Sequence, residues 1–243
     1  MMSEANRLPS GRSKRFDPFV GRLRGYVEAA EPGSLVAQFG EAPSTPATNT
    51  TGQVPHWLFA LADTLPANPL RALALIAAHP DQRDAVRAAI AGEPRLVERR
   101  YLRACVQDAM RLYPTTPLLS RVTVEEAELG GAVVPAGTQV LWVNLFHHRD
   151  RERVEFADRF APDAWTDGEA GGDWSFNHFS HGPQGCPGAS LALLVGTAVV
   201  SEVLERRDVS LRAPHLAAGK PLPHMPDVFR TRVTLAPCAP RRA

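Results

Sequence analysis

Lysine is almost absent from this chain of 243 residues, in which Lys14 and Lys220 are the only two among 27 basic side chains. Arginine supplies the rest, and 26 acidic residues leave a net charge of +1 at pH 7. So small a net charge offers no electrostatic argument for binding nucleic acid or an anionic membrane surface. We therefore expect neither kind of partner.

Cysteine and long apolar runs are scarce too. The three cysteines, Cys105, Cys186 and Cys238, are odd in number and unclustered, which is a poor basis for a disulfide framework and suits a reducing compartment. The longest helix-like apolar run, residues 189–200, is too short to span a bilayer. Residues 1–16 are polar and basic, without the apolar centre of a signal peptide. These absences predict a soluble, cytoplasmic protein.

The chain is otherwise typical of a soluble globular protein, with 44% hydrophobic and 22% charged residues. We expect a disordered tail at 1–15 and a single domain at 16–243, with a proline- and threonine-rich linker at about 40–53. Apolar residues at helical spacing predict helices at 17–31, 54–78, 81–91, 94–113 and 186–205. Alternating segments predict short strands at 121–129, 132–135, 138–143 and 229–235. The expected fold class is mainly α with a minor β component.

Residues 179–188 form the most informative segment, Phe-Ser-His-Gly-Pro-Gln-Gly-Cys-Pro-Gly. Glycines allow a tight turn whose backbone N–H groups can point at one atom, and a helix beginning at Cys186 would add the positive end of its dipole. Both effects favour a thiolate, which is a nucleophile or a soft metal ligand. Taken alone, Cys186 would fit better as a buried cysteine that caps a core helix after a loop.

The order Phe179, Gly182, Cys186, Gly188 resembles the heme-ligand loop of the cytochrome P-450 family, the heme-thiolate monooxygenases. The resemblance implies that Cys186 is the axial thiolate ligand of the iron in heme b. It places Phe179, Gly182, Gln184 and Gly188 around the cofactor, with the phenylalanine ring against it. We therefore expect these residues to form a heme-binding loop.

Two side chains are implied by the resemblance to contact the heme propionates. Arg121 would pair with a propionate in two-point geometry, although an arginine at the edge of a surface strand explains it equally well. Gln184 stands where the family usually has arginine or histidine, and it can donate a hydrogen bond but supplies no charge. His178 or His181 are candidates to compensate for that missing charge.

Asp108 and Arg111 lie three residues apart on the predicted helix 94–113 and therefore share one face. An exposed ion pair is the simple interpretation, but the face is apolar, and charges there are costly unless they pair. The family has Glu-x-x-Arg on the corresponding helix, which implies a structural lock with a shortened acid here. Ala164 stands where the family has a third arginine. The lock is therefore incomplete unless Arg159 or Arg153 substitutes.

Asp63 and Thr64 are an acid beside an alcohol in an otherwise apolar segment. Residues 60–64 resemble the family motif Ala-Gly-x-Asp/Glu-Thr, with Leu61 in the glycine position. The resemblance implies that the carboxylate gathers protons and the hydroxyl relays them to bound oxygen. Pro66 and Pro69 predict a kink beside the pair. The alternative is two shorter helices with the pair at a solvent-facing break.

Other kinds of metal or catalytic site have little support. His147 and His148 are adjacent, and the sequence contains no Cys-x-x-Cys or His-x-x-x-His pair for zinc. A cysteine hydrolase would need a histidine base and an oxyanion hole, and no pattern marks His181 as that base.

The resemblance covers residues from about 15 to the end and implies the C-terminal half of the fold, from helix G onward, of the soluble bacterial type. The implied activity is insertion of one oxygen atom of O2 into a small apolar substrate, with electrons from a ferredoxin-type donor. Without the other half, an exposed apolar face would need a second polypeptide or self-association. The alternative function is a truncated, non-catalytic remnant or interaction subunit that binds heme without turnover.

Overall fold

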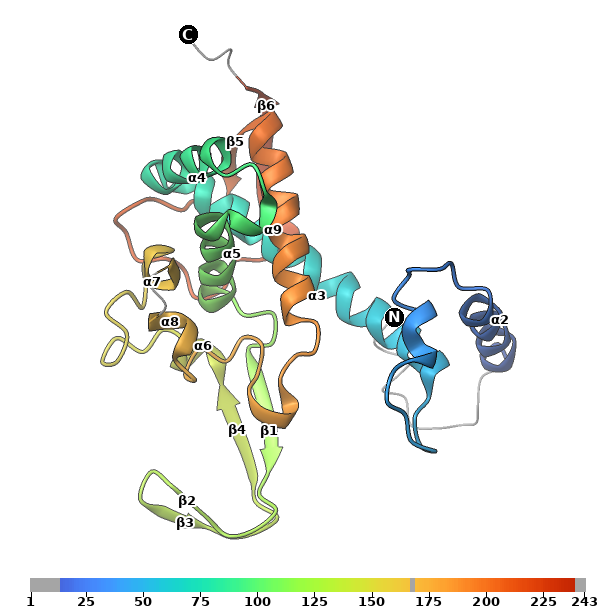
Figure 1. The fold of residues 1–243 in the computed structure, drawn as a ribbon. Coiled ribbons are helices and arrows are strands. Elements are labelled where there is room, and N and C mark those ends of the chain that lie inside the picture. Colours follow the sequence, from blue (N-terminus) through green and yellow to red (C-terminus); the bar gives the residue numbers. More distant parts are fainter. Residues whose placement is uncertain (1–13, 167–168, 239–243) are drawn as a thin grey trace. The chain divides into compact units, whose positions relative to one another are not determined.

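The computed structural model describes residues 14–166 and 169–238 (Figure 1). The chain divides after Asp63 into two compact units, residues 1–63 and 64–243. Most of the expected disordered tail, residues 1–13, lies outside the described residues.

The first unit contains α2 (Phe16–Glu28), the 3-10 helix η1 (Ala37–Gly40) and the beginning of α3 (Thr50–Ala78). The backbone N–H of Gly52 donates to Oδ1 of Asn49 at 2.9 Å, which caps the first turn of α3. The helix therefore starts four residues before the expected position and includes the end of the expected linker. Phe39 packs edge-on against Trp57, with ring centroids 5.2 Å apart.

The second unit contains the rest of α3 with α4 (Pro80–Gly92), α5 (Arg100–Leu112) and α9 (Ala189–Arg206). Helix α5 packs against both α4 and α9 (Figure 1). The expected helix at 94–113 is divided, because Arg99 has non-helical angles and separates the 3-10 helix η2 (Leu96–Glu98) from α5. Shorter helices are α6 (Asn144–His147), α7 (Asp163–Thr166), α8 (Glu169–Gly172), η3 (Gly182–Gln184) and η4 (Val228–Arg230).

Three antiparallel strand pairs complete the second unit. They are β1 (Leu118–Val122) with β4 (Gln139–Val143), β2 (Ala127–Leu129) with β3 (Ala132–Val134), and β5 (Arg207–Ala213) with β6 (Arg232–Pro237). Gly130 and Gly131, at φ +59° and +80°, form the tight turn between β2 and β3. Strand β5 was not predicted, because its charged residues obscure the alternation that buries Val209.

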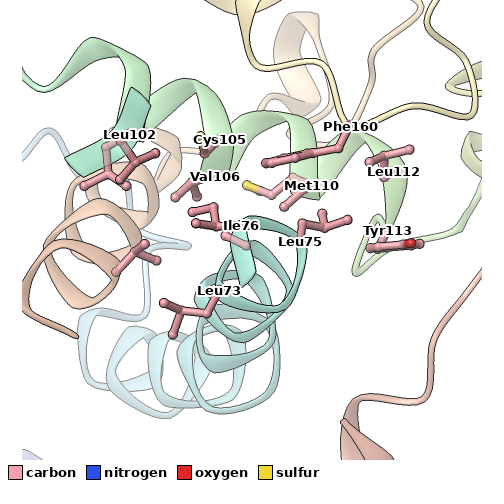
Figure 2. Packing of buried hydrophobic residues seen from close by; sticks show 14 of the residues in the cluster. Leu73, Leu75, Ile76, Leu102, Cys105, Val106, Met110, Leu112, Tyr113 and Phe160 are labelled. Carbon is pink, nitrogen blue, oxygen red and sulfur yellow. The ribbon is translucent and has the colours of Figure 1, made fainter. Parts of the chain in front are cut away.

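The core of the second unit lies between α3, α5 and α9, and much of it is seen in Figure 2. Leu75 and Ile76 come from α3, Leu102 and Val106 from α5, and all four are fully buried. A Cβ added to Gly196 of α9 would lie 3.3 Å from Cγ1 of Val106. Glycine at this position therefore lets α9 approach α5 closely, and a larger residue would require Val106 to move by a few tenths of an ångström.

Helix α3 continues through Pro66 and Pro69. The alternative of two shorter helices is therefore wrong: the backbone stays helical across both prolines, although each lacks an N–H donor. The two prolines line an apolar pocket of about 330 Å³ between α3 and α9, together with Leu65, Leu70, Leu73, Val195 and Val199. Among the described helices, none is long and apolar enough to cross a membrane.

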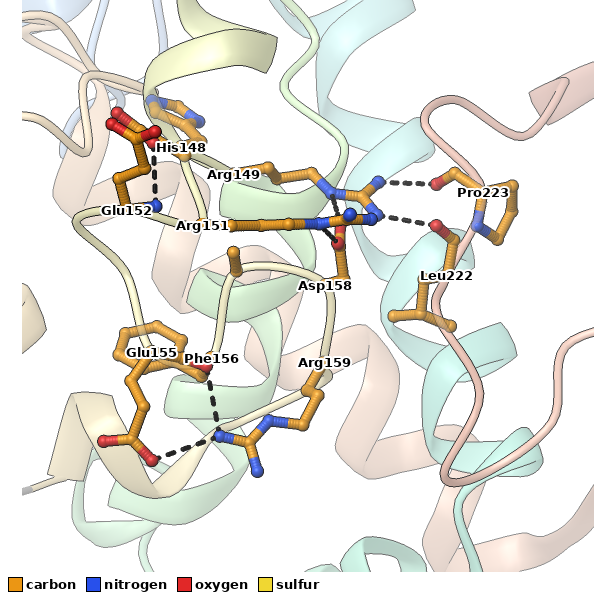
Figure 3. Close-up of polar contacts among 12 residues, drawn as sticks. His148, Arg149, Arg151, Glu152, Glu155, Phe156, Asp158, Arg159, Leu222 and Pro223 are labelled. Atoms are coloured by element: carbon orange, nitrogen blue, oxygen red, sulfur yellow. Dashed lines mark hydrogen bonds and ion pairs between the residues drawn. The ribbon is translucent and has the colours of Figure 1, made fainter.

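A buried arginine ties the irregular segment after α6 to the C-terminal part of the chain (Figure 3). Nε of Arg149 donates to Oδ1 of Asp158 at 2.9 Å, and its terminal nitrogens donate to the carbonyls of Leu222 and Pro223, both at 2.6 Å. Arg151 donates to the other oxygen of Asp158 at 2.5 Å. The segment is therefore anchored despite its lack of regular structure.

Candidate functional site

The loop before α9 is closed by two backbone hydrogen bonds. The N–H of Gly185 donates to the carbonyl of Gly182 at 3.0 Å, and that of Cys186 donates to the carbonyl of Phe179 at 2.7 Å. Cys186 is exposed at the end of this loop. The expectation that the helix begins at Cys186 is wrong, since its N–H is used by Phe179 and α9 begins at Ala189.

The surroundings of the sulfur are open on the side of Gly188. A Cβ added there would lie 3.9 Å from Sγ of Cys186, so glycine leaves space beside the sulfur. Phe179 is half-buried and packs against the core of the second unit. Within residues 14–166 and 169–238, no group of three or more His, Cys, Asp or Glu side chains is arranged to hold a metal ion.

Gly182 should be sensitive to substitution, because its φ of +62° is one that residues with a side chain adopt at a cost. An added Cβ meets nothing within 4 Å, so Gly182→Ala isolates that backbone cost. We expect this substitution to lower the free energy of unfolding, measured in urea, by about 1–2 kcal/mol. Gly92→Ala, equally free of clashes and without positive φ, should be neutral or stabilising. Equal free energies of unfolding for the two variants would contradict a backbone cost at Gly182.

The two residues expected near the propionates are both exposed. Nη1 of Arg121 donates to the carbonyl of Ser120 at 2.9 Å, within strand β1. This contact is consistent with an arginine at the edge of a surface strand. The binding of a propionate by Arg121 stays a prediction. Gln184 lies in η3.

Two histidines of the loop carry a ring nitrogen that is shielded from solvent. Nδ1 of His178 and Nε2 of His181 have no hydrogen-bond partner among the described residues. Burial, and then the nearby His148, lower the pKa of His178 to about 3. His178 is therefore neutral at physiological pH and does not supply the charge that Gln184 lacks.

Asp108 and Arg111 form a fully buried ion pair, so the alternative of a surface pair is wrong. Nε of the guanidinium donates to Oδ1 of the carboxylate at 2.5 Å. The other guanidinium nitrogens donate to four backbone carbonyls of the segment after α6, those of His148 (3.1 Å), Phe156 (3.4 Å), Ala157 (2.9 Å) and Arg159 (2.7 Å). The pair therefore fixes the path of that segment against α5.

The lock is completed by a tryptophan. Nε1 of Trp165 donates to Oδ1 of Asp108 at 3.0 Å, and the backbone N–H of Ala161 donates to Oδ2 at 2.7 Å. Neither of the two arginines considered as substitutes takes this place: the side chain of Arg159 lies near Glu155, and Arg153 is exposed. The sequence did offer a signal for this contact: Trp165, whose indole N–H is a hydrogen-bond donor, directly follows Ala164, the position at which the family has arginine.

His148, which is fully buried, joins this lock to the segment that precedes the cysteine loop. Its Nδ1 lies 3.0 Å from the carbonyl of Arg111 and must donate, while its Nε2 accepts from the N–H of Asn177 at 2.8 Å. Burial lowers the pKa of His148 to about 4, although the bond to Arg111 opposes this shift. The ring is therefore held neutral, with both nitrogens in use.

Asp63 and Thr64 both lie in α3. Asp63 is exposed and is the last residue of the first unit, whereas Thr64 is half-buried and begins the second. Leu61, in the position of the family glycine, is 37% exposed. The role of the acid and the alcohol in proton delivery stays a prediction.

Known proteins share both sequence and fold with this chain. It is 35% identical over 113 residues to cytochrome P450 4c3 of Drosophila melanogaster, covering 46% of this chain and 21% of that protein. It is 29% identical over 231 residues to cyclooctat-9-en-7-ol 5-monooxygenase of Streptomyces melanosporofaciens, covering 82% of this chain and 49% of that protein. The chain thus spans less than half the length of these relatives.

A solved structure of a zebrafish cytochrome P450 with abiraterone superposes with a TM-score of 0.70 at 23% identity, covering 90% of this chain and 59% of that one. This likeness confirms the predicted fold class, mainly α with a minor β component. The soluble bacterial type and the assignment to the C-terminal half stay predictions. The family model for cytochrome P450 matches residues 43–222. The chain therefore belongs to the cytochrome P450 family, whose members are heme-thiolate enzymes.

Proposed function

We propose that this chain is the heme-binding part of a heme-thiolate monooxygenase, with Cys186 as the axial ligand. The proposed reaction inserts one oxygen atom of O2 into a small apolar substrate. The observation that carries the proposal is the exposed Cys186 at the end of a hydrogen-bonded loop. Membership of the family supports the same chemistry.

The residues around Cys186 fit a heme b group. A porphyrin supplies four nitrogens to its iron, so one soft protein ligand is enough to hold it, and a single exposed sulfur meets that need. Gly188 leaves the flank of the sulfur open, and Phe179 lies at the base of the loop. Arg121 and Gln184 are exposed and available to bind the propionates, Arg121 by charge and Gln184 by a hydrogen bond.

A bound heme would supply the redox chemistry, and thiolate ligation favours cleavage of the O–O bond. The contribution of the chain is to hold the sulfur and to move protons. We propose that Asp63 collects protons from solvent, where it is exposed, and that the hydroxyl of Thr64 passes them on.

The proposed partners are a ferredoxin-type electron donor and a small apolar substrate. Family members generally use redox partner proteins and act on apolar molecules. The Streptomyces relative is named for a monooxygenation of cyclooctat-9-en-7-ol, which supports a substrate of this class.

A second candidate function is a non-catalytic remnant or interaction subunit that binds heme without turnover. The apolar pocket between α3 and α9 favours it, since Leu65, Val195 and their neighbours present an apolar surface that another polypeptide or a second copy would cover. Light scattering of the purified chain, with and without heme, distinguishes self-association from a missing partner.

The test of the proposed function is a difference spectrum. The full chain is supplied with heme, reduced and exposed to carbon monoxide. We expect a strongly red-shifted Soret band, the signature of thiolate ligation, and complete loss of that band in Cys186→Ser. Substrate-dependent oxygen consumption with a ferredoxin-type donor then separates an enzyme from a remnant.

Cys238→Ser is the matched control, because Cys238 is also exposed but lies at the end of β6, away from the loop. It should keep the red-shifted band. A chain that takes up no heme, or a band that survives Cys186→Ser, would overturn the proposal.

A further inference from the structure

One buried side chain connects the Asp108–Arg111 pair to the segment that leads into the cysteine loop. His148 and Arg111 bond to each other twice, since Nη1 of Arg111 donates to the carbonyl of His148 and Nδ1 of His148 donates to the carbonyl of Arg111. The backbone N–H of His148 is fixed as well, donating to the carbonyl of Asn144 at 2.8 Å. The imidazole therefore has a defined position and a defined tautomer.

The second ring nitrogen faces the loop. Nε2 of His148 accepts from the N–H of Asn177 at 2.8 Å. The carbonyl of Asn177 then accepts from the N–H of Ser180 at 3.1 Å, and the carbonyl of Phe179 accepts from the N–H of Cys186 at 2.7 Å. Hydrogen bonds and short stretches of covalent backbone thus connect the buried pair on α5 to the cysteine.

The loop has a specific need for such an anchor. Ser180 adopts a φ of +57°, a left-handed conformation that is unfavourable for a residue with a side chain. A conformation of this kind persists only where its surroundings hold it. The bond of Asn177 to His148 lies before Ser180, and the bond of Cys186 to Phe179 closes the loop after it.

We infer that His148 is a positioning residue for Cys186, holding the start of residues 177–186 through the N–H of Asn177. The inference rests on the proposed function, because the position of Cys186 matters as that of a metal ligand. His148 bonds through its ring nitrogens to the backbone of Arg111 and Asn177. It acts through the backbone, and its effect should appear in the loop before any cofactor is added.

Backbone amide exchange of the full chain without heme provides the test. His148→Phe keeps a ring but removes both hydrogen bonds, and it should raise exchange at Asn177 and Cys186 about tenfold, as expected for the loss of a buried hydrogen bond. His148→Gln retains one donor and one acceptor on its amide and should restore much of the protection. Amides of β5 serve as the internal reference.

Val86→Ala is the control for general destabilisation, because Val86 is fully buried on α4 and its hydrocarbon side chain forms none of the hydrogen bonds that join His148 to the loop. Alkylation adds a second reading: buried Cys105 should stay protected in His148→Phe, showing that the fold persists. If exchange at residues 177–186 rises no more than in Val86→Ala, or if His148→Gln gives no rescue, the inference is overturned.

The outcome is separable from that of the proposed function. If His148→Phe loses protection of the loop amides while the wild-type chain fails to bind heme, the inference is supported and the heme proposal is overturned. A red-shifted carbon monoxide spectrum in the wild-type chain, with unchanged exchange in His148→Phe, would do the reverse.

Discussion

Replacing Asp108 with asparagine is expected to lower the free energy of unfolding by about 3–5 kcal/mol, because it leaves the fully buried guanidinium of Arg111 without a counter-charge. The carboxylate also accepts from the N–H groups of Ala161 and Trp165. The side-chain amide of asparagine has only one oxygen that can accept these bonds. Its NH2 group would face an N–H donor that the carboxylate oxygen accepted before. Urea unfolding of the full chain measures the loss.

The matched control is Glu155→Gln, the same acid-to-amide change in the exposed pair of Glu155 and Arg159. That substitution should cost no more than about 0.5 kcal/mol. Trp165→Phe should fall between the two, at about 1.5–3 kcal/mol, because it removes one donor to a charged acceptor and keeps most of the ring. If Asp108→Asn costs as little as Glu155→Gln, the pair contributes nothing as a lock.

The second large effect is a fall in stability as the pH drops from 6.5 toward 4. The pKa of His148 is lowered by burial to about 4 from 6.5, and that of His178 to about 3. Between pH 6.5 and the lowered pKa of each histidine, the unfolded chain binds a proton that the folded chain excludes. The free energy of unfolding therefore decreases as the pH falls. For His148, which is fully buried, we expect a loss of about 2 kcal/mol by about pH 5.

Urea titrations at several pH values between 7 and about 4.5 give this dependence. In His148→Phe the slope over this range should be smaller, because one of the histidines that resist protonation has been removed. Carboxylates with a lowered pKa, such as that of Asp158, lose most of their contribution below about pH 4 and so add little to the dependence in this window. A stability independent of pH across this range would contradict the buried, neutral state of His148.

Much of the fold could be predicted from local pattern. Helical spacing located α4, α5 and most of α3, and paired glycines located the turn of the β2–β3 hairpin, because these signals lie within one element. The Asp108–Arg111 pair was predictable for the same reason, since three residues on a helix share a face. Strand β5 was missed because its burial is decided by packing and not by its charged sequence.

The partners of the candidate site were harder to predict, because they come from distant segments. Trp165 reaches Asp108 across 57 residues, and the family pattern pointed to an arginine instead. His148 bonds to two backbone groups, the carbonyl of Arg111 37 residues away and the N–H of Asn177 29 residues away, and backbone groups leave no mark in a sequence. The start of α9 at Ala189 depends on a hydrogen bond between Cys186 and Phe179 that only the folded loop shows.

The contacts of Arg111 have a consequence for which substitutions the chain tolerates. Its four acceptors after α6 are main-chain carbonyls, at positions 148, 156, 157 and 159. Every amino acid carries that group, so the arginine recognises the route of the backbone and is indifferent to most side chains along it. These four bonds therefore place no demand on the identity of the residues that accept them, whereas replacing the arginine would remove all four bonds at once.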